Sequence, residues 1–291
     1  MREAAGTPSR SGFSGTVLQL LRRYPLISFF VLAYGISWTY VIVFLVAWPL
    51  PDTIVTNTPA LLGPVVAGFV MTAVTGGKAG VRQLLRRFVI WRVGAAWYLF
   101  ALLGIPAFYI ASIALVPGAL ASFRAPTLTA ALLYPVFFLV VMILDGPLLE
   151  EPGWRGFALP RLQVRLGPLA AAVILGILWA GWHAPQYLTP TFSAANGGLT
   201  VSGVIVFLLA LVAFSVIITW VFNHTQGSLL IAILLHTLIN FSQGLSSDVF
   251  PSAANNEIAP VAVFGLMALV IIIATRGRLG YVRPAVGTET T

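Results

Sequence analysis

The chain has 291 residues, of which 59% are hydrophobic and only 8% are charged, and it contains no cysteine. Soluble globular chains usually carry about 25% charged residues, so a water-soluble enzyme and a disordered chain are both excluded. Sixteen basic residues against eight acidic ones give a net charge of +8. In a soluble protein this excess would suggest nucleic acid, but in so apolar a chain it is expected to report membrane topology, and we predict no nucleic-acid partner.

Long uncharged stretches divide the chain into segments of membrane-spanning length. A bilayer core about 30 Å thick needs roughly 20 apolar residues for each helix that crosses it. Turn-rich polar stretches cut the longest uncharged run into three helices. The predicted spans are 25–48, 59–76, 94–117, 127–149 with a continuation to about 157, 168–187, 201–222, 228–245 and 257–275. The sequence therefore predicts an all-α fold, a polytopic transmembrane bundle of about eight helices.

One membrane domain accounts for most of the chain. The predicted parts are a cytoplasmic N-terminal segment at 1–24, an eight-span membrane domain at 25–276 and a cytoplasmic tail at 277–291. The first apolar segment is too long for a signal-peptide core, so it is expected to be a retained helix. With the N-terminus inside, every Lys and Arg except Arg124 falls on the inner side. This positive-inside pattern predicts an integral membrane protein with both termini in the cytoplasm and membrane lipids as its surroundings.

Three acids stand at the end of the fourth predicted span: Asp145, Glu150 and Glu151. A charge at membrane depth costs about 2.5–3.5 kcal/mol on insertion scales, so it is by default a functional hypothesis. Glu151 and Arg155 are spaced i,i+4 on one helix face, which predicts a structural ion pair. Neighbouring helical side chains diverge by about 100°, so Glu150 is left free to act as a general base. The alternative is that these acids lie in a loop that faces water.

Two histidines fall inside other predicted spans, His183 in the fifth and His236 in the seventh. A lone histidine on an apolar helix is more often a packing residue. Two histidines on different spans, with a double glutamate on a third, favour a shared polar site instead. Asn240 follows His236 by one helical turn, so both project from one face. Trp179 precedes His183 by one turn and is expected either to form one wall of the site or to pack against neighbouring apolar side chains.

At these residues the chain resembles the CAAX-protease and bacteriocin-processing (CPBP) family of intramembrane proteases, which includes type II prenyl-protein endopeptidases and lysostaphin-resistance-like proteins. The three family motifs appear as Glu150-Glu151-Pro-Gly-Trp-Arg155, Trp179-Ala-Gly-Trp-His183 and His236-Thr-Leu-Ile-Asn240, within a core of about 130–245. Trp179 stands where the family usually has phenylalanine, which bears on the shape of the pocket more than on its chemistry. Each motif alone is weak, but their ordered set on the fourth, fifth and seventh spans is specific.

The resemblance implies an intramembrane endopeptidase whose helices enclose a catalytic cavity. It implies that Glu150 and His183 activate the attacking water and that His236 and Asn240 stabilise the oxyanion. The bracing residues would be Glu151 and Arg155, with Trp179 in support. It further implies a membrane-associated or lipidated substrate, such as a prenylated CAAX-like peptide or protein, and a bacterial or archaeal cell membrane.

The role of a metal stays open at this point. Glu150, His183 and His236 form a plausible zinc triad with an open fourth position. No His-Glu-x-x-His helix is present, so the strongest sequence sign of a zinc peptidase is missing. The family has been described both as metalloproteases and as metal-free glutamate proteases, and the sequence slightly favours a site without tightly bound Zn²⁺.

Two other classes of protein can use intramembrane acids and histidines. A transporter or proton relay would string polar residues along a path and often shows an internal repeat, whereas this sequence clusters them on three spans. A non-catalytic scaffold or immunity protein would keep the site as a relic, but all the named positions are intact. An endopeptidase is the leading hypothesis.

Overall fold

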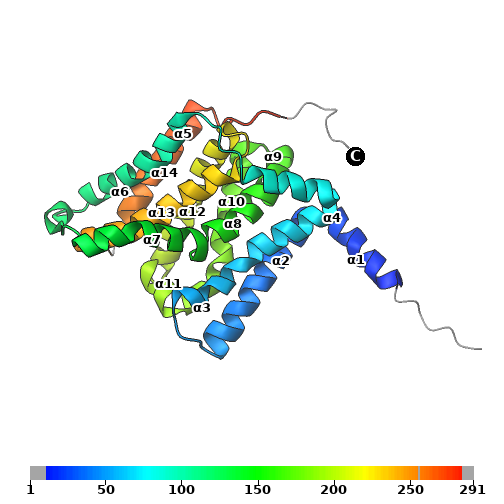
Figure 1. Ribbon diagram of the computed structural model, residues 1–291, viewed down its shortest axis with the longest axis horizontal. Helices are drawn as coiled ribbons and strands as arrows, with labels where there is room; N and C mark the ends of the chain where they lie inside the picture. The colour runs from blue at the N-terminus through cyan, green and yellow to red at the C-terminus, as the bar shows by residue number, and fades with distance from the viewer. Residues whose placement is uncertain (1–10, 255, 284–291) are drawn as a thin grey trace, which may run out of the picture.

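The structure is a computed structural model that describes residues 11–254 and 256–283. Helices and loops make up these residues, with no β-strand among them. Figure 1 shows long helices running roughly side by side in one bundle, with α1 projecting from it near the N-terminus. The prediction of an all-α polytopic bundle is confirmed. The first ten residues of the predicted N-terminal segment and the last eight of the predicted tail lie outside the described residues.

Seven helical stretches of the described chain are long and apolar enough to cross a membrane. They are Pro25–Ala47, Ile54–Arg87, Ala95–Ala114, Leu128–Leu166, Pro168–Leu188, Val201–His224 and Leu229–Val249. The last predicted span, 257–275, is an apolar helix of 17 residues, Ile258–Ala274. It is somewhat shorter than the roughly 20 residues that a bilayer core needs. The predicted count of about eight is therefore met by seven full-length stretches and one short helix.

Several of these stretches consist of more than one element. In chain order the elements are α1 (Ser11–Arg23), α2 (Pro25–Tyr40), η1 (Val41–Ala47), α3 (Ile54–Asn57), η2 (Thr58–Leu61), α4 (Leu62–Arg87), α5 (Ala95–Leu99), η3 (Phe100–Gly104), α6 (Ile105–Ala114), η4 (Ala119–Ser122), α7 (Leu128–Leu144), α8 (Pro147–Gly153), η5 (Trp154–Ala158), α9 (Leu159–Leu166), α10 (Pro168–Trp182), η6 (Ala184–Leu188), α11 (Pro190–Ala195), α12 (Val201–His224), α13 (Leu229–Val249), η7 (Pro251–Ala253) and α14 (Ile258–Ala274).

Close approaches between helices set the positions of α8 and α10. A Cβ added to Gly153 in α8 would lie 2.3 Å from the Pro64 carbonyl oxygen of α4. A Cβ added to Gly176 in α10 would lie 2.7 Å from Cα of Val212 in α12. Small residues let membrane helices approach this closely. Close packing is needed because the hydrophobic effect does not drive helices together in lipid. These contacts place α8 against α4 and α10 against α12.

The fourth predicted span is interrupted before the two glutamates and then continues further than expected. Helix α7 ends at Leu144, and Gly146 has a φ of +109°, which an L side chain rarely adopts. Pro147 then opens α8 at a position where its missing N–H is not needed. The expected continuation to about 157 is correct, but the helix runs on through a π-helical turn and ends only at Leu166. The break puts Glu150 in the first turn of α8.

The second predicted span, 59–76, is shorter than the helix in the structure. Gly77 has a φ of +57° and interrupts the helical geometry of α4, but the helix resumes and reaches Arg87. The resumed part carries Lys78, Arg82 and Arg86, all of which are exposed. Hydropathy predicts that the span ends before its first charged residue, Lys78. Backbone hydrogen bonds nevertheless continue the helix to Arg87.

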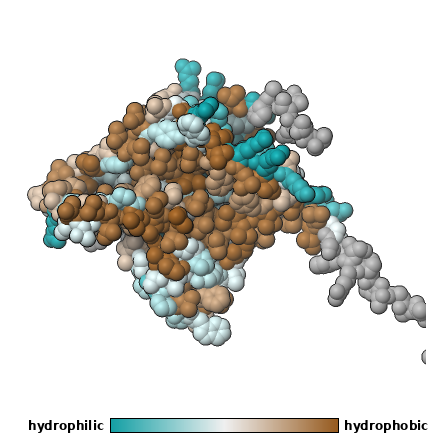
Figure 2. All heavy atoms as spheres, viewed as in Figure 1, coloured by the Kyte–Doolittle hydropathy of each residue, from teal (hydrophilic) through white to brown (hydrophobic). Residues whose placement is uncertain are grey.

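Figure 2 shows that hydrophobic side chains dominate the visible face of the bundle, with hydrophilic residues gathered along one edge over the end of α4. Exposed large hydrophobic side chains are spread along the outer surfaces of the spans, including Leu132 and Val136 of α7. Such a surface is expected where helices face lipid rather than water. The chain is an integral membrane protein.

Candidate active site

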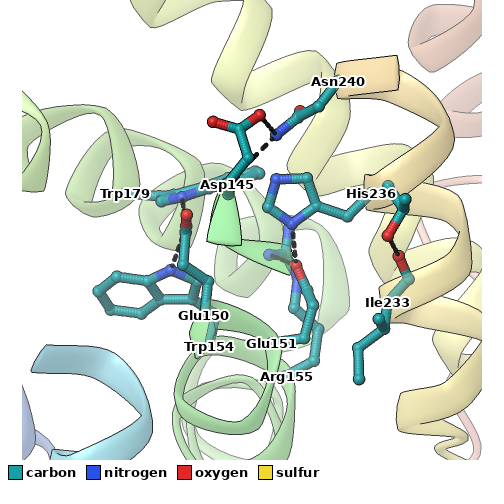
Figure 3. A network of polar contacts seen from close by, with 10 residues as sticks. Asp145, Glu150, Glu151, Trp154, Arg155, Trp179, Ile233, His236 and Asn240 are labelled. Atoms are coloured by element: carbon teal, nitrogen blue, oxygen red, sulfur yellow. Dashed lines mark hydrogen bonds and ion pairs between the residues drawn. The ribbon is translucent and has the colours of Figure 1, made fainter. Parts of the chain in front are cut away.

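The predicted polar residues meet where α8, α10 and α13 converge, as Figure 3 shows for most of them. Glu151 and Arg155 are fully buried, and Glu150 is 3% exposed. His183 and His236 are 8% and 4% exposed. The alternative in which the acids lie in a water-facing loop is therefore wrong for Glu150 and Glu151, whereas Asp145 is exposed in the break between α7 and α8.

Glu151 is the centre of a buried charged network, in which its own Oε2 accepts no hydrogen bond from a described residue. Its Oε1 accepts a hydrogen bond from Arg155 Nη1 at 2.8 Å, which confirms the ion pair predicted from the i,i+4 spacing. The same oxygen lies 2.9 Å from Nδ1 of His236, which reaches it from α13. A carboxylate only accepts hydrogen bonds, so the Nδ1 of His236 carries a proton and its Nε2 is directed away from Glu151.

Arg155 also contacts an aromatic face. Its guanidinium carbon lies 4.6 Å from the centroid of the Trp179 ring. The Nε and Nη2 atoms of Arg155 donate to no acceptor within the described part of the chain. A cation over an indole face is stabilised by the ring quadrupole, most strongly where water is excluded. The ring of Trp179 therefore supports the buried charge that balances Glu151.

Glu150 is held by two indole groups. Its Oε2 accepts hydrogen bonds from Nε1 of Trp179 at 2.6 Å and from Nε1 of Trp154 at 3.1 Å. Its Oε1 accepts no hydrogen bond from any residue that the structure describes. The carboxylate is thus fixed through one oxygen while the other oxygen is free to bond a reactant.

Gly146 leaves room for the free oxygen of Glu150. A Cβ added at Gly146 would lie 2.2 Å from Glu150 Oε1, well inside van der Waals contact. Together with the φ of +109°, this close approach makes glycine the only residue that fits without displacing the carboxylate. The break between α7 and α8 therefore shapes the site as well as the helix.

His183 sits at the end of α10 in an aromatic enclosure. Its Nδ1 is 2.8 Å from the carbonyl oxygen of Trp179. A carbonyl only accepts, so Nδ1 carries the proton and Nε2 is left as an acceptor. The rings of Trp182 and Phe207 meet the imidazole edge-on, and Phe192 stacks against it with 5.6 Å between centroids. The ring of Trp179 lies near both imidazoles, with 6.3 Å between centroids to His183 and 5.1 Å to His236.

Phe192, which stacks on His183, belongs to the short helix α11. The loop residue Asp52 holds this helix in place. The backbone N–H of Thr191 donates to Asp52 Oδ2 at 2.9 Å, and Asn57 donates to Asp52 Oδ1 at 2.7 Å. The hydrogen bonds from Asn57 and Thr191 lower the pKa of Asp52 below its usual value. Asp52 therefore stays ionised at neutral pH and anchors the segment that covers His183.

Asn240 stands at the more open side of the cluster. It is partly exposed, and its Nδ2 lies 3.2 Å from the carbonyl oxygen and 3.4 Å from Oδ2 of Asp145, whose side chain is exposed. An amide nitrogen carries two protons, and Asp145 presents one acceptor to each of them, the longer contact being that with Oδ2. Figure 3 shows Asn240 and Asp145 together on the same side of the His236 ring.

Sequence reasoning gave no role to Trp154 and none to Asp145. The spacing of Trp154, four residues after Glu150, is the same i,i+4 signal that linked Glu151 to Arg155. The contact of Asp145 with Asn240 joins residues 95 apart in sequence, and no spacing rule points to it.

The side-chain positions do not form a metal site as they lie. Within the described residues, no three His, Asp or Glu side chains gather closely enough to hold a metal ion. The donor types of Glu150, His183 and His236 suit zinc. Oε2 of Glu150 and Nδ1 of both histidines are engaged with protein groups, which leaves Oε1 of Glu150 and the two Nε2 atoms as the ones that would face a metal ion. Zinc stays a prediction.

Comparison with known proteins agrees with the motifs. Residues 130–242 match the family model described as type II CAAX prenyl endopeptidase Rce1-like. The chain is also 29% identical over 140 residues to CAAX prenyl protease 2 of Methanococcus maripaludis, an alignment that covers 48% of this chain and 49% of that protein. The match thus spans about half the length of this relative. The predicted resemblance to type II prenyl-protein endopeptidases is confirmed over residues 130–242, a segment that contains every predicted site residue.

Proposed function

We propose that this protein is an intramembrane endopeptidase that cleaves prenylated, CAAX-like peptides or proteins. The observation that carries the proposal is the Glu150 carboxylate, which is buried, held through Oε2 and free at Oε1. The match of residues 130–242 to type II CAAX prenyl endopeptidases supports the substrate class. The relative's name, CAAX prenyl protease 2, points the same way.

The first step is attack by water on the scissile carbonyl carbon. Glu150 Oε1 takes a proton from the water while the water oxygen bonds to the carbon, and the carbonyl electron pair moves to its oxygen. His183 Nε2 accepts the other water proton as a hydrogen bond and so orients the nucleophile. A base fixed within hydrogen-bond reach of the water is worth about 10²- to 10⁴-fold in rate.

The second requirement is stabilisation of the oxyanion. The proposed donors are Nε2–H of His236 in its protonated form and an N–H of Asn240 released from its longer contact, with Asp145 Oδ2. Oε1 of Glu151 lies 2.9 Å from Nδ1 of His236 and so orients the ring. Donors held rigidly at the developing charge often supply the largest part of catalysis, and removal of one costs about 10²- to 10³-fold.

The third step is collapse of the tetrahedral intermediate. The oxyanion re-forms the carbonyl, the C–N bond breaks, and Glu150 returns its proton to the departing nitrogen. The products are a carboxylic acid and an amine, and the Glu150 carboxylate is regenerated for another turnover. Burial of the site strengthens each of these electrostatic contacts.

We place the basic end of the bundle and both termini at the cytoplasmic side. The bases of α1, the second half of α4, and α9 gather toward one end, whereas Asp52, Arg124 and Asp248 lie in or beside the opposite loops. Lys and Arg mark cytoplasmic loops in membrane proteins.

The test is hydrolysis of a farnesylated CAAX peptide by the purified chain in liposomes, with the unprenylated peptide as control. We expect release of the C-terminal tripeptide by the wild type and loss of release in Glu150→Gln and His183→Ala. Equal turnover by all three proteins would overturn the catalytic assignment. Inhibition by 1,10-phenanthroline that added Zn²⁺ reverses would instead assign a metal mechanism.

A further inference from the structure

We propose that Trp179 and Trp154 are positioning residues that clamp Glu150 through their indole N–H groups and so decide which carboxylate oxygen acts as the base. Both donors bond the same atom, Oε2, at 2.6 and 3.1 Å. The kinetic part of the inference rests on the proposed peptidase function, and the structural part does not.

The two indoles reach Glu150 from different helices. Trp154 follows Glu150 by one helical turn, and Trp179 comes from α10, 29 residues further along the chain. Both rings are almost completely buried. The carboxylate is therefore held from its own helix and from a neighbouring one, which restricts rotation of the carboxyl group as well as its displacement.

Neutral donors suit this position better than a cation would. Hydrogen bonds to an ionised acceptor are shorter and roughly twice as strong as those between neutral groups. An indole donates one hydrogen bond and brings no charge, so it holds the carboxylate without forming an ion pair. Glu151 shows the contrast, because Arg155 and His236 converge on its Oε1.

Trp179 makes its other contacts through the ring rather than through the N–H. Its face lies under the Arg155 guanidinium, and the His236 ring meets it edge-on with 5.1 Å between centroids. Phenylalanine, the residue usual in the family that the motifs resemble, retains an aromatic face for both contacts but lacks the donor and the five-membered ring. Trp179→Phe therefore deletes the bond to Glu150 together with some packing, which a matched control must account for.

Two other tryptophans serve as references. Trp182 is fully buried, yet its Nε1 finds no hydrogen-bond acceptor in the part of the chain that the structure describes, so its signal reports an unbonded indole. Its ring contacts His183 and Trp154, so the kinetic control lies elsewhere. Trp220 of α12 packs against Trp97 and His224, outside the site, and its Nε1 donates to no described acceptor. Trp220→Phe makes the same substitution without removing a hydrogen bond.

The kinetic experiment compares the two variants on the prenylated peptide. We expect Trp179→Phe to lower kcat by about 10- to 100-fold, as for a base displaced by a fraction of an ångström, with KM within about twofold. Trp220→Phe is expected to keep kcat within about threefold, because only packing changes. Replacing Trp179 by 3-benzothienylalanine, which has sulfur in place of the N–H, should reproduce the loss seen with phenylalanine. Equal losses in the Trp179 and Trp220 variants, or full activity with benzothienylalanine, would overturn the proposal.

A spectroscopic experiment tests the clamp without any substrate. In ¹⁵N-labelled protein the indole N–H signals of Trp154 and Trp179, assigned from their phenylalanine variants, should lie downfield of the Trp182 signal. Glu150→Gln replaces an anionic acceptor with a neutral one and should move both signals upfield while leaving Trp182 in place. Unmoved Trp154 and Trp179 signals would refute the clamp. Shifted signals in a protein that cleaves no peptide would support the clamp and contradict the proposed function.

Discussion

The two sides of the helix that begins at Pro147 use neighbouring glutamates in opposite ways. On one side, Glu151 bonds Arg155 and His236, and all three side chains are buried. On the other side, Glu150 bonds two neutral indoles through one oxygen. Each carboxylate has a second oxygen that accepts no hydrogen bond from a described residue, but Glu151 is fully buried and Glu150 is 3% exposed. A free oxygen alone therefore does not separate their roles. The kind of partner does: Glu151 is paired with a cation and serves the fold, whereas Glu150 is held by neutral donors and is the proposed base.

The largest expected effect is on the Glu150 side. Glu150→Gln keeps the size of the side chain and an acceptor for the indoles but removes the base, so kcat should fall by about 10²- to 10⁴-fold with little change in thermal stability. Peptide hydrolysis and thermal unfolding in detergent measure the two quantities. A large loss of stability in this variant would mean that Glu150, like Glu151, is structural.

The Glu151 side should show the reverse pattern. Arg155→Ala leaves the buried Glu151 without its cation, and removing one partner of a buried pair costs about 3–5 kcal/mol of folding free energy. We expect a strongly lowered unfolding temperature and loss of activity that follows loss of the fold. Arg165→Ala on the exposed surface of α9 is the control and should change stability by less than about 0.5 kcal/mol. A stable Arg155→Ala protein would contradict a structural role for this network.

A substitution at Gly146 tests whether catalysis depends on the free oxygen of Glu150. Gly146→Ala places a Cβ against Oε1, and a displacement of about 1 Å is expected to lower kcat about 100-fold. Gly167→Ala is the matched control, since Gly167 also has a positive φ, of +77°, but no described atom within 4 Å of an added Cβ. Both variants carry backbone strain of about 1–3 kcal/mol, so only the first should lose activity beyond its loss of stability. Parallel behaviour of the two variants would attribute the whole effect to strain.

The smallest expected effect concerns the anchor of Asn240. Asp145→Ala removes the longer of two contacts, at 3.4 Å, while the carbonyl of residue 145 remains. We expect kcat to fall by no more than about tenfold, the equivalent of one ordinary hydrogen bond. Asp248→Ala, at the far end of α13 where Asp248 bonds Tyr134, should leave kcat unchanged. A larger loss than that of Asn240→Ala itself would give Asp145 a direct role in the reaction.

Helical periodicity and composition predicted the spans and one of the polar contacts. The structure places most helix ends within a few residues of the expected positions, and Glu151 pairs with Arg155 as its spacing requires. Local rules succeed here because a helix fixes the relative directions of residues three or four apart. They failed at Gly77 and Gly146, where one glycine changes the path of the backbone without changing hydropathy.

The same local rules could not predict the contacts between helices. The bond from Trp179 to Glu150 and the contact of Asn240 with Asp145 join different spans. Their existence depends on how closely and at what rotation two helices pack, which small residues such as Gly153 and Gly176 control.

The sequence by itself determined that the chain is a helical membrane protein, which spans carry the acids and histidines, and that Glu151 belongs to Arg155. The physical reason is that bilayer thickness and helical pitch are constants that apply to any apolar chain. The tertiary structure alone decided how Glu150 is held, because two indole N–H groups and one glycine had to be brought to a single carboxylate from three segments of backbone. This arrangement of partners around Glu150 separates its role from that of Glu151.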